Sequence, residues 1–213
     1  DLGTKGSGLT KYSRGGDGRL TLKGAVRELL ATEFLTSLGV PTSQTFSIIE
    51  TAEQLQRNDE PSPTRSAVLV RRSNSHIRIG TFQRLKYLNE YDDIALLLNH
   101  LCQNYFTNIK SKKSIKFLAE DIFSESVKRI AESIGRIIIS GFVHGVLNTD
   151  NFNITGEVFD YGPWRFIEFA NTSFTAAYFD NNGRYSFGRQ PEAALWALAQ
   201  LGKTLNEFID EKK

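Results

Sequence analysis

The sequence predicts an α+β fold in two parts, a mixed strand-and-helix part over residues 1–88 and a mainly helical part over residues 89–213. Three features of the pattern favour this fold. Two β-branched or apolar runs of strand length precede residue 73, the pattern becomes helical after Gly80, and a polar hairpin interrupts the helices between residues 141 and 162. A cleft between two such parts is a common place for a ligand to bind.

The first part is expected to contain one helix flanked by strands. Apolar residues recur at helical spacing from Thr21 to Leu38, and Gly39 and Pro41 follow in the order typical of a helix C-terminus. Residues 3–19 are rich in Gly and Ser and indicate a strand end followed by a loop. The strand-like runs are residues 45–51 and 66–72, joined by a polar connection over residues 58–64.

Three helices are predicted in the second part, because apolar residues recur every three or four positions over residues 91–106, 124–140 and 192–209. The middle one carries the clearest periodicity of the chain. The last is expected to be anchored by Leu195, Trp196, Leu198 and Leu201. The basic run at residues 110–113 indicates a solvated loop rather than a binding patch.

The composition argues against several classes of partner. The 26 basic side chains nearly cancel the 24 acidic ones, so a net charge of +2 favours neither nucleic acid nor a membrane surface. No apolar run approaches the ~20 residues that span a bilayer. The one cysteine, Cys102, cannot form an internal disulfide, which fits an intracellular compartment, and it is expected to be a small core residue. The chain has no methionine and begins within a pattern, so we expect a piece of a longer protein.

The segment from Phe142 to Phe166 carries the residues best suited to catalysis or metal binding. Asp150 and Asn151 follow the clearest helix, and a predicted hairpin of two short strands, 152–154 and 158–159, ends at Asp160. The hairpin would bring Asn151 and Asp160 to face one point. An amide oxygen and a carboxylate suit Mg²⁺, which takes oxygen ligands and completes its shell with water and phosphate.

This arrangement follows the logic of the protein-kinase catalytic loop and its Asp-Phe-Gly element, with one departure. The catalytic Asp of that motif lies five residues before the metal-binding Asn, and here that position is Val146, which cannot take a proton. Asp150 is the nearest replacement. The alternative is that Asp150, Asn151 and Asp160 only cap turns, where Asp and Asn are common.

Candidate phosphate ligands come from the first part of the chain. Lys5 lies on or just after a strand, and Glu28 lies in the first long helix, so they could form the Lys–Glu pair that recurs in kinase-like folds. Arg71 and Arg78 flank a turn, and guanidinium groups suit phosphate because they are planar donors with a fixed charge. As isolated features, both would be ordinary surface arginines.

Taken together, the chain resembles the selenoprotein O family. The resemblance rests on KGSGLTKYSRGGDGR at 5–19, RELLATEFLTSLGVPT at 27–42, VRRSNSHIRIGTF at 70–82, HGVLNTDNFNITGEVFDYGPW at 144–164 and GRYSFGRQPEAALWALAQL at 183–201. It implies a protein-kinase-like two-lobed fold in which ATP binds in the opposite orientation to that in kinases. It also implies that AMP is transferred, with Mg²⁺ or Mn²⁺, to Ser, Thr or Tyr hydroxyls of proteins. It also implies a cytoplasmic protein if bacterial and a mitochondrial one if eukaryotic.

By position, the resemblance assigns a role to each candidate. Asp150 resembles the base, Asn151 and Asp160 the metal ligands, and Glu28 the partner of the lysine. The nucleotide-binding residues by resemblance are Lys5, Asp17, Gly18, Arg71, Arg78 and Asp160. The family's N-terminal Gly-rich loop and its C-terminal extension have no counterpart in these residues. The alternatives are therefore a catalytically silent ATP-binding pseudokinase or scaffold module and, with less support, a phosphotransferase.

Overall fold

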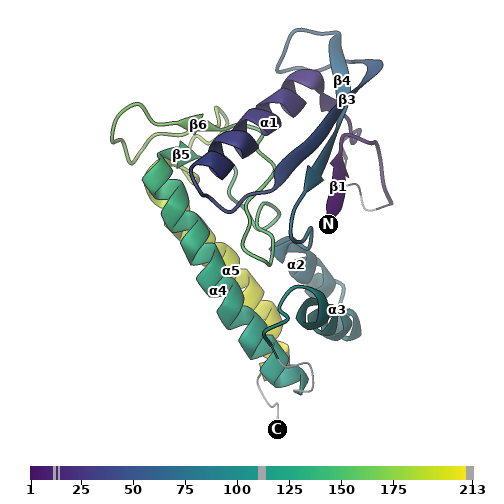
Figure 1. The fold of residues 1–213 in the computed structure, drawn as a ribbon, viewed down its shortest axis with the longest axis vertical. Coiled ribbons are helices and arrows are strands. Elements are labelled where there is room, and N and C mark those ends of the chain that lie inside the picture. The colour runs from purple at the N-terminus through teal and green to yellow at the C-terminus, as the bar shows by residue number, and fades with distance from the viewer. Residues whose placement is uncertain (12, 14, 110–113, 210–213) are drawn as a thin grey trace.

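The structure is a computed structural model that describes residues 1–11, 13, 15–109 and 114–209. It contains a four-stranded sheet with one helix against it and four further helices beyond residue 78. Figure 1 shows the sheet and α1 at one end and the long α4 and α5 extending away from them. The α+β class predicted from the sequence is confirmed, and the division near residue 88 stays a prediction. The basic run at 110–113 lies outside the described residues.

The sheet is antiparallel and is organised around its central strand, β4. It comprises β1 (Leu2–Lys5), β2 (Leu20–Thr21), β3 (Gln44–Leu55) and β4 (Thr64–Arg72). Strands β1 and β2 pair with one side of β4, and β3 pairs with the other. Gly3 lies opposite Arg71 in this register. Since side chains alternate along a strand, Lys5 and Arg71 project from the same face of the sheet.

Helix α1 (Leu22–Ser37) packs on the sheet and ends close to where the sequence predicts. Thr21 caps its N-terminus, accepting a hydrogen bond from the Gly24 N–H at 3.0 Å. Beyond its end, Gly39 adopts a φ of 72°, which favours glycine. Ala25 forms a small buried cluster with Ala67 and Leu69 of the sheet, and this cluster fixes the helix on its support.

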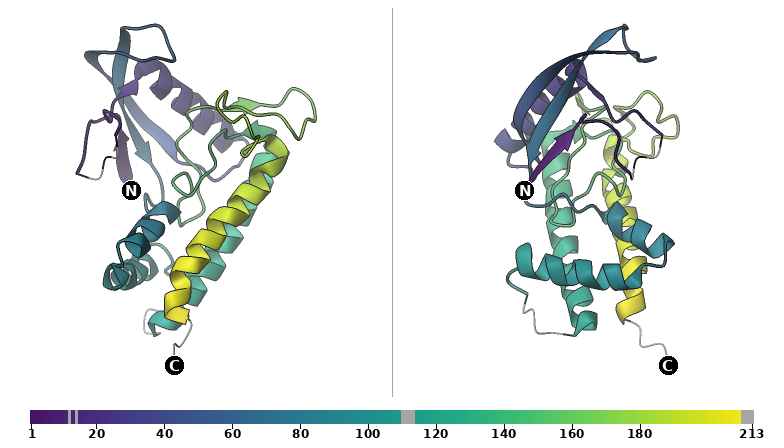
Figure 2. Two further views of the ribbon diagram at one scale, coloured as in Figure 1. Left: turned by 180° about the vertical axis from the view of Figure 1, so that it is seen from behind. Right: turned by 90° about the vertical axis from the view of Figure 1, so that its right-hand side faces the viewer.

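Four helices form the rest of the framework: α2 (Ile79–Tyr87), α3 (Tyr91–Asn104), α4 (Ile115–Ser140) and α5 (Gln190–Ile209). Figure 2 shows α4 and α5 side by side and α3 crossing them. Leu198 and Leu201 anchor α5 as predicted, but Leu195 and Trp196 are 68% and 54% exposed, so the prediction was wrong for these two. Among the described residues, no helix combines the length and hydropathy needed to cross a bilayer.

The segment between α4 and α5 contains little regular structure. Its short strands β5 (Phe142–Val143) and β6 (Arg165–Phe166) pair with each other, and a 3-10 helix, η1 (Phe187–Arg189), precedes α5. The predicted hairpin reverses direction through a single bridge between Phe152 and Val158 instead of a continuous ladder. The Phe159 N–H donates to the Asn151 carbonyl at 3.3 Å, which brings the two ends of the hairpin together.

One large hydrophobic core supports this segment from below. It runs from the end of α1 through α2 and α3 to α4 and α5, and it includes Leu147, Phe152, Val158 and Tyr161 of the connecting segment. Cys102 belongs to this core, as predicted, and is 2% exposed. The polar residues of 144–162 thus belong to a loop most of whose apolar side chains are buried, with Val146 half-buried.

Candidate functional site

Three cations from different parts of the chain converge on the carboxylate of Asp160. The Lys5 Nζ lies 3.0 Å and the Arg71 Nη1 lies 2.5 Å from Oδ1, and the Arg78 Nη2 lies 3.1 Å from Oδ2. Lys5 comes from the end of β1, Arg71 from β4 and Arg78 from the residue before α2. Burial alone would raise the pKa of Asp160, but Lys5, Arg71 and Arg78 hold it well below its ordinary value. The carboxylate is therefore ionised at neutral pH.

Lys5 is held between two carboxylates. Its Nζ lies 2.6 Å from the Glu28 Oε1, and Glu28 is 2% exposed on α1. Burial would lower the pKa of Lys5, but Asp160 and Glu28 outweigh it and raise that pKa. The Lys–Glu pair predicted from the sequence is thus formed in the structure, and Lys5 stays charged.

An aromatic ring fixes the two arginines. The guanidinium carbons of Arg71 and Arg78 lie 4.7 Å and 4.8 Å from the centre of the Phe159 ring. The three cations of the cluster face the two carboxylates of Glu28 and Asp160, which leaves a local excess of one positive charge. Such a rigid group of donors is suited to an anion with several oxygens, such as a phosphate.

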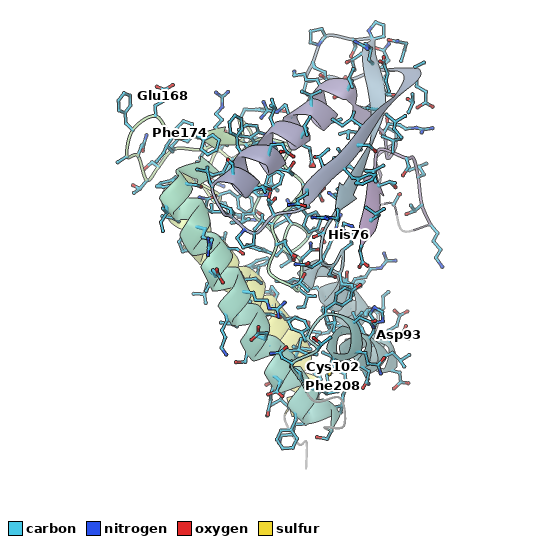
Figure 3. The ribbon with its side chains drawn as sticks, viewed as in Figure 1. His76, Asp93, Cys102, Glu168, Phe174 and Phe208 are labelled. Atoms are coloured by element: carbon cyan, nitrogen blue, oxygen red, sulfur yellow. The ribbon has the colours of Figure 1, made fainter. Side chains whose placement is uncertain are left out.

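His76 is a further member of this neighbourhood that the sequence did not single out. Its pKa is lowered by burial and by the charges of Arg71 and Arg78, so the ring is neutral at pH 7. An ideal Cβ on Gly3 would lie 2.8 Å from its Nε2, so the close contact requires a glycine on β1. Figure 3 labels His76 between the sheet and the helices below it. The local sequence around His76 does not predict its contact with Gly3.

The Asn151 carbonyl accepts a hydrogen bond across the hairpin from the N–H of Phe159, the residue before Asp160, and the Asn151 side chain has one atom suited to a cation. Its Nδ2 donates to the Val146 carbonyl at 2.6 Å, so its amide oxygen is the atom suited to ligate. Within the described ranges, no group of three His, Cys, Asp or Glu side chains could hold a metal. A cation here would therefore take one amide and one carboxylate oxygen from Asn151 and Asp160, and would share Asp160 with its three cationic partners.

Asp150 is docked against the first turn of α2. The Gly80 N–H donates to the Thr149 carbonyl at 3.0 Å, and the Asp150 N–H donates to the Asn148 Oδ1 at 2.9 Å. An ideal Cβ on Gly80 would lie 2.0 Å from the Asp150 Oδ1. The carboxylate thus occupies the space that any larger residue at position 80 would need.

Gly80→Ala is therefore expected to displace the Asp150 carboxylate while leaving the fold intact. If Asp150 acts directly on the substrate, a shift of this size should lower the turnover number by about 10²-fold. Steady-state kinetics and thermal unfolding would measure both effects. The matched control is Gly135→Ala in α4, where an added Cβ meets no atom within 4 Å. Unchanged turnover in Gly80→Ala would show that the position of the carboxylate is unimportant.

Asp17 and Gly18 lie in a loop beside β1, and among the described residues they form no hydrogen bond or ion pair with the Asp160 cluster. Asp17 binds Arg57 through two bonds of 2.9 Å and 3.1 Å, and its side chain is 50% exposed. Gly18 has a φ of 69° and accepts a hydrogen bond from the Gly8 N–H at 3.0 Å, which closes the loop on itself. Their role in nucleotide binding stays a prediction.

The fold and the site together define a class of protein: an α+β protein whose cationic cluster, flanked by oxygen donors, is suited to phosphate groups. A family model described as protein adenylyltransferase SelO matches residues 1–213. The chain therefore belongs to the SelO family, as the sequence motifs indicated.

Similar curated proteins carry the name protein nucleotidyltransferase YdiU. That of Synechocystis sp. is 51% identical over 212 residues, which are 100% of this chain and 44% of the relative. That of Gloeobacter violaceus is 56% identical over 209 residues (98% and 43%), and that of Clostridium botulinum strain Okra is 38% identical over 206 residues (96% and 40%). The chain thus spans less than half the length of these relatives.

Proposed function

We propose that this chain forms the nucleotide-binding core of a metal-dependent protein adenylyltransferase, which transfers AMP from ATP to Ser, Thr or Tyr hydroxyls of a protein. The observation that carries the proposal is the convergence of Lys5, Arg71 and Arg78 on Asp160. These cations come from three separate elements, and they outnumber by one the carboxylates of Glu28 and Asp160 that they face. Their excess positive charge attracts an anionic ligand.

The terminal phosphates of ATP would bind to the cations of the cluster. Arg71 is 6% exposed and is held by Phe159 and Asp160, so its guanidinium group is already positioned before a ligand arrives. Arg78 is more exposed and could reach outward to a second phosphate. With the β- and γ-phosphates held there, the α-phosphorus would face Asp150, which lies beside the same turn of α2 that Arg78 precedes.

A divalent cation fits the donor set of this site. Asn151 and Asp160 would hold Mg²⁺ or Mn²⁺ through an amide and a carboxylate oxygen, and phosphate and water would complete the shell. When bound, the cation would neutralise phosphate charge and orient the triphosphate. Binding of this cation requires a rearrangement of the Asp160 ion pairs. The phosphates would replace the carboxylate at Arg71 and Arg78, and the carboxylate would rotate toward the cation.

The reaction would be a single displacement at the α-phosphorus. The acceptor hydroxyl forms a new P–O bond, the bond from the α-phosphorus to the bridging oxygen breaks, and pyrophosphate leaves. Asp150 takes the hydroxyl proton. Lys5, Arg71 and Arg78 hold the charge that develops on the pyrophosphate. Because Val146 stands where a kinase would carry its base, the arrangement supports this role for Asp150 better than it supports ordinary phosphoryl transfer.

We also propose that the whole arrangement is protein-kinase-like. A sheet that carries a lysine, a helix that carries its glutamate partner, and a loop between buried helices that carries the metal ligands occur in the order that such a fold requires. The site lies where the segment from 144 to 162 meets β1, β4 and the start of α2.

The proposed reaction is tested with ATP labelled at the α- or the γ-phosphate, incubated with the protein, Mg²⁺ or Mn²⁺, and a mixture of acceptor proteins. Label on protein from the α position only is the expected result. Label from the γ position only would show a kinase. No label from either, together with thermal stabilisation by ATP and metal, would identify a silent nucleotide-binding module.

A further inference from the structure

A buried glutamine connects the start of α5 to the segment that carries the candidate metal ligands. Gln190 is 0% exposed. Its Oε1 accepts a hydrogen bond from the His144 N–H at 3.0 Å, and its Nε2 donates to the Phe142 carbonyl at 2.9 Å and the Phe187 carbonyl at 3.5 Å. The Gln190 amide thus bonds only to backbone groups. Two of them, on His144 and Phe142, lie 46 and 48 residues away along the chain.

His144 extends this connection to the hairpin. It is 0% exposed, its Nε2 lies 2.9 Å from the Phe159 carbonyl, and its Nδ1 lies 3.3 Å from the Val146 N–H. Only the neutral ring with its proton on Nε2 satisfies both contacts, since it donates on one side and accepts on the other. Burial lowers the pKa of His144 to about 4, so this is the form present at neutral pH.

The contacts of His144 end next to both candidate metal ligands. The Phe159 carbonyl belongs to the peptide bond that precedes Asp160, which holds a φ of 66° in the left-handed region. The Val146 carbonyl accepts the hydrogen bond from the Asn151 Nδ2 at 2.6 Å. His144 therefore holds the peptide group before Asp160 directly, and it is linked to the Asn151 amide through Val146, whose N–H bonds to His144 and whose carbonyl bonds to Asn151.

We infer that Gln190 is a positioning residue that acts through His144 to hold Asn151 and Asp160 in the geometry that binds a divalent cation. The inference rests on the proposed function, because it assigns these two residues to a metal. Groups behind the direct ligands of a metal are worth about 10–100-fold in metal affinity. The side-chain bonds of Gln190 go to His144, Phe142 and Phe187 and to no cation of the cluster, so its effect should fall mainly on the metal.

The alternative is that Gln190 only satisfies buried backbone groups and contributes to stability. Both roles predict a lower melting temperature when Gln190 is replaced, since unsatisfied N–H and C=O groups would remain. Only the positioning role predicts a selective loss of metal affinity in the folded protein. A conservative replacement of His144 separates the two further, because Gln can place an amide nitrogen where the Nε2 donor stood.

The experiment measures Mn²⁺ binding by electron paramagnetic resonance, with a non-hydrolysable ATP analogue present, in the wild type, Gln190→Met, His144→Leu and His144→Gln. We expect Gln190→Met and His144→Leu to weaken Mn²⁺ binding by about 10–100-fold. His144→Gln should stay within about threefold of the wild type. Affinity for the analogue without metal should change by less than about twofold in all of them.

The matched control is Gln200→Leu, in the same helix and without a side-chain hydrogen bond to the loop. Wild-type Mn²⁺ affinity in folded Gln190→Met would overturn the inference and leave the proposed function standing. Should that variant not fold, the two His144 variants decide, because equal affinities in His144→Leu and His144→Gln would also overturn it. A wild type that binds no Mn²⁺ beside the analogue would overturn the metal site and this inference together.

Discussion

Asp150→Asn is expected to lower the rate of AMP transfer by about 10²–10⁴-fold and to leave ATP affinity within about twofold. The reason is that Asn has nearly the same shape and cannot take a proton. Asp150 lies against Gly80, outside the ion pairs that join Lys5, Arg71 and Arg78 to Asp160. The binding of phosphates and the acceptance of the proton are thus assigned to different groups.

Initial rates with α-labelled ATP and a direct binding measurement would test this separation. Asp93→Asn is the matched control, because Asp93 is exposed on α3 at a distance from the site (Figure 3). The control should retain full activity. If Asp150→Asn loses ATP binding and transfer in equal measure, Asp150 is a nucleotide ligand and not the base.

Asp160→Asn is expected to weaken metal-dependent ATP binding and to destabilise the fold by about 3 kcal/mol at pH 7. The larger part of the destabilisation comes from Arg71, whose side chain is 7% exposed and would lose its carboxylate partner. Removing one member of a buried ion pair costs roughly 3–5 kcal/mol, because the other charge is left buried. Lys5 retains Glu28, so its contribution to the loss is smaller.

The pH dependence of the unfolding free energy provides a second measurement on the same variant. The pKa of Asp160 in the folded protein is lowered, so its contribution to stability is fully present above the unfolded value of about 3.9 and is lost as the pH falls below it. Urea unfolding should therefore show a difference between wild type and Asp160→Asn that is constant from pH 5 to 7 and shrinks toward pH 3.

The comparison variant is Asp17→Asn. Asp17 is also paired with an arginine and also has a lowered pKa, caused first by the Arg19 N–H and then by Arg57. Its side chain is half exposed, however, so solvent screens the pair and the variant should be nearly as stable as the wild type. Equal destabilisation in Asp17→Asn and Asp160→Asn would contradict the importance given to burial.

Local patterns predicted most of the helices because apolar spacing decides which face of a helix is buried. They placed the start of α4 at Ser124, whereas the helix begins at Ile115. The buried stripe continues back through Leu118 and Ile122, but Ser126 stands on it between Ile122 and Ile130 and donates to the Ile154 carbonyl at 3.0 Å. Polar residues at core positions interrupt the apolar stripe that a prediction follows.

The candidate site shows the same limit. The pair of Lys5 and Glu28 was predicted and is formed, because both residue types and their places on a strand and a helix carry a signal. The contact of Asp150 with Gly80 and the bonds of Gln190 to His144 were missed. They join residues that are distant along the chain, and a glutamine or a glycine alone gives no sign of its partner.

The pairing of β1 with β4 has a consequence for how this chain tolerates insertions. Lys5 reaches Asp160 because Gly3 lies opposite Arg71 and side chains alternate along the strand. Adding one residue between Gly3 and Lys5 would turn the ammonium group to the far side of the sheet, toward no carboxylate of the cluster. Additions beyond Gly6, in the loop that leads to β2, would leave the pairing of β1 with β4, and so the side of the sheet from which Lys5 projects, unchanged.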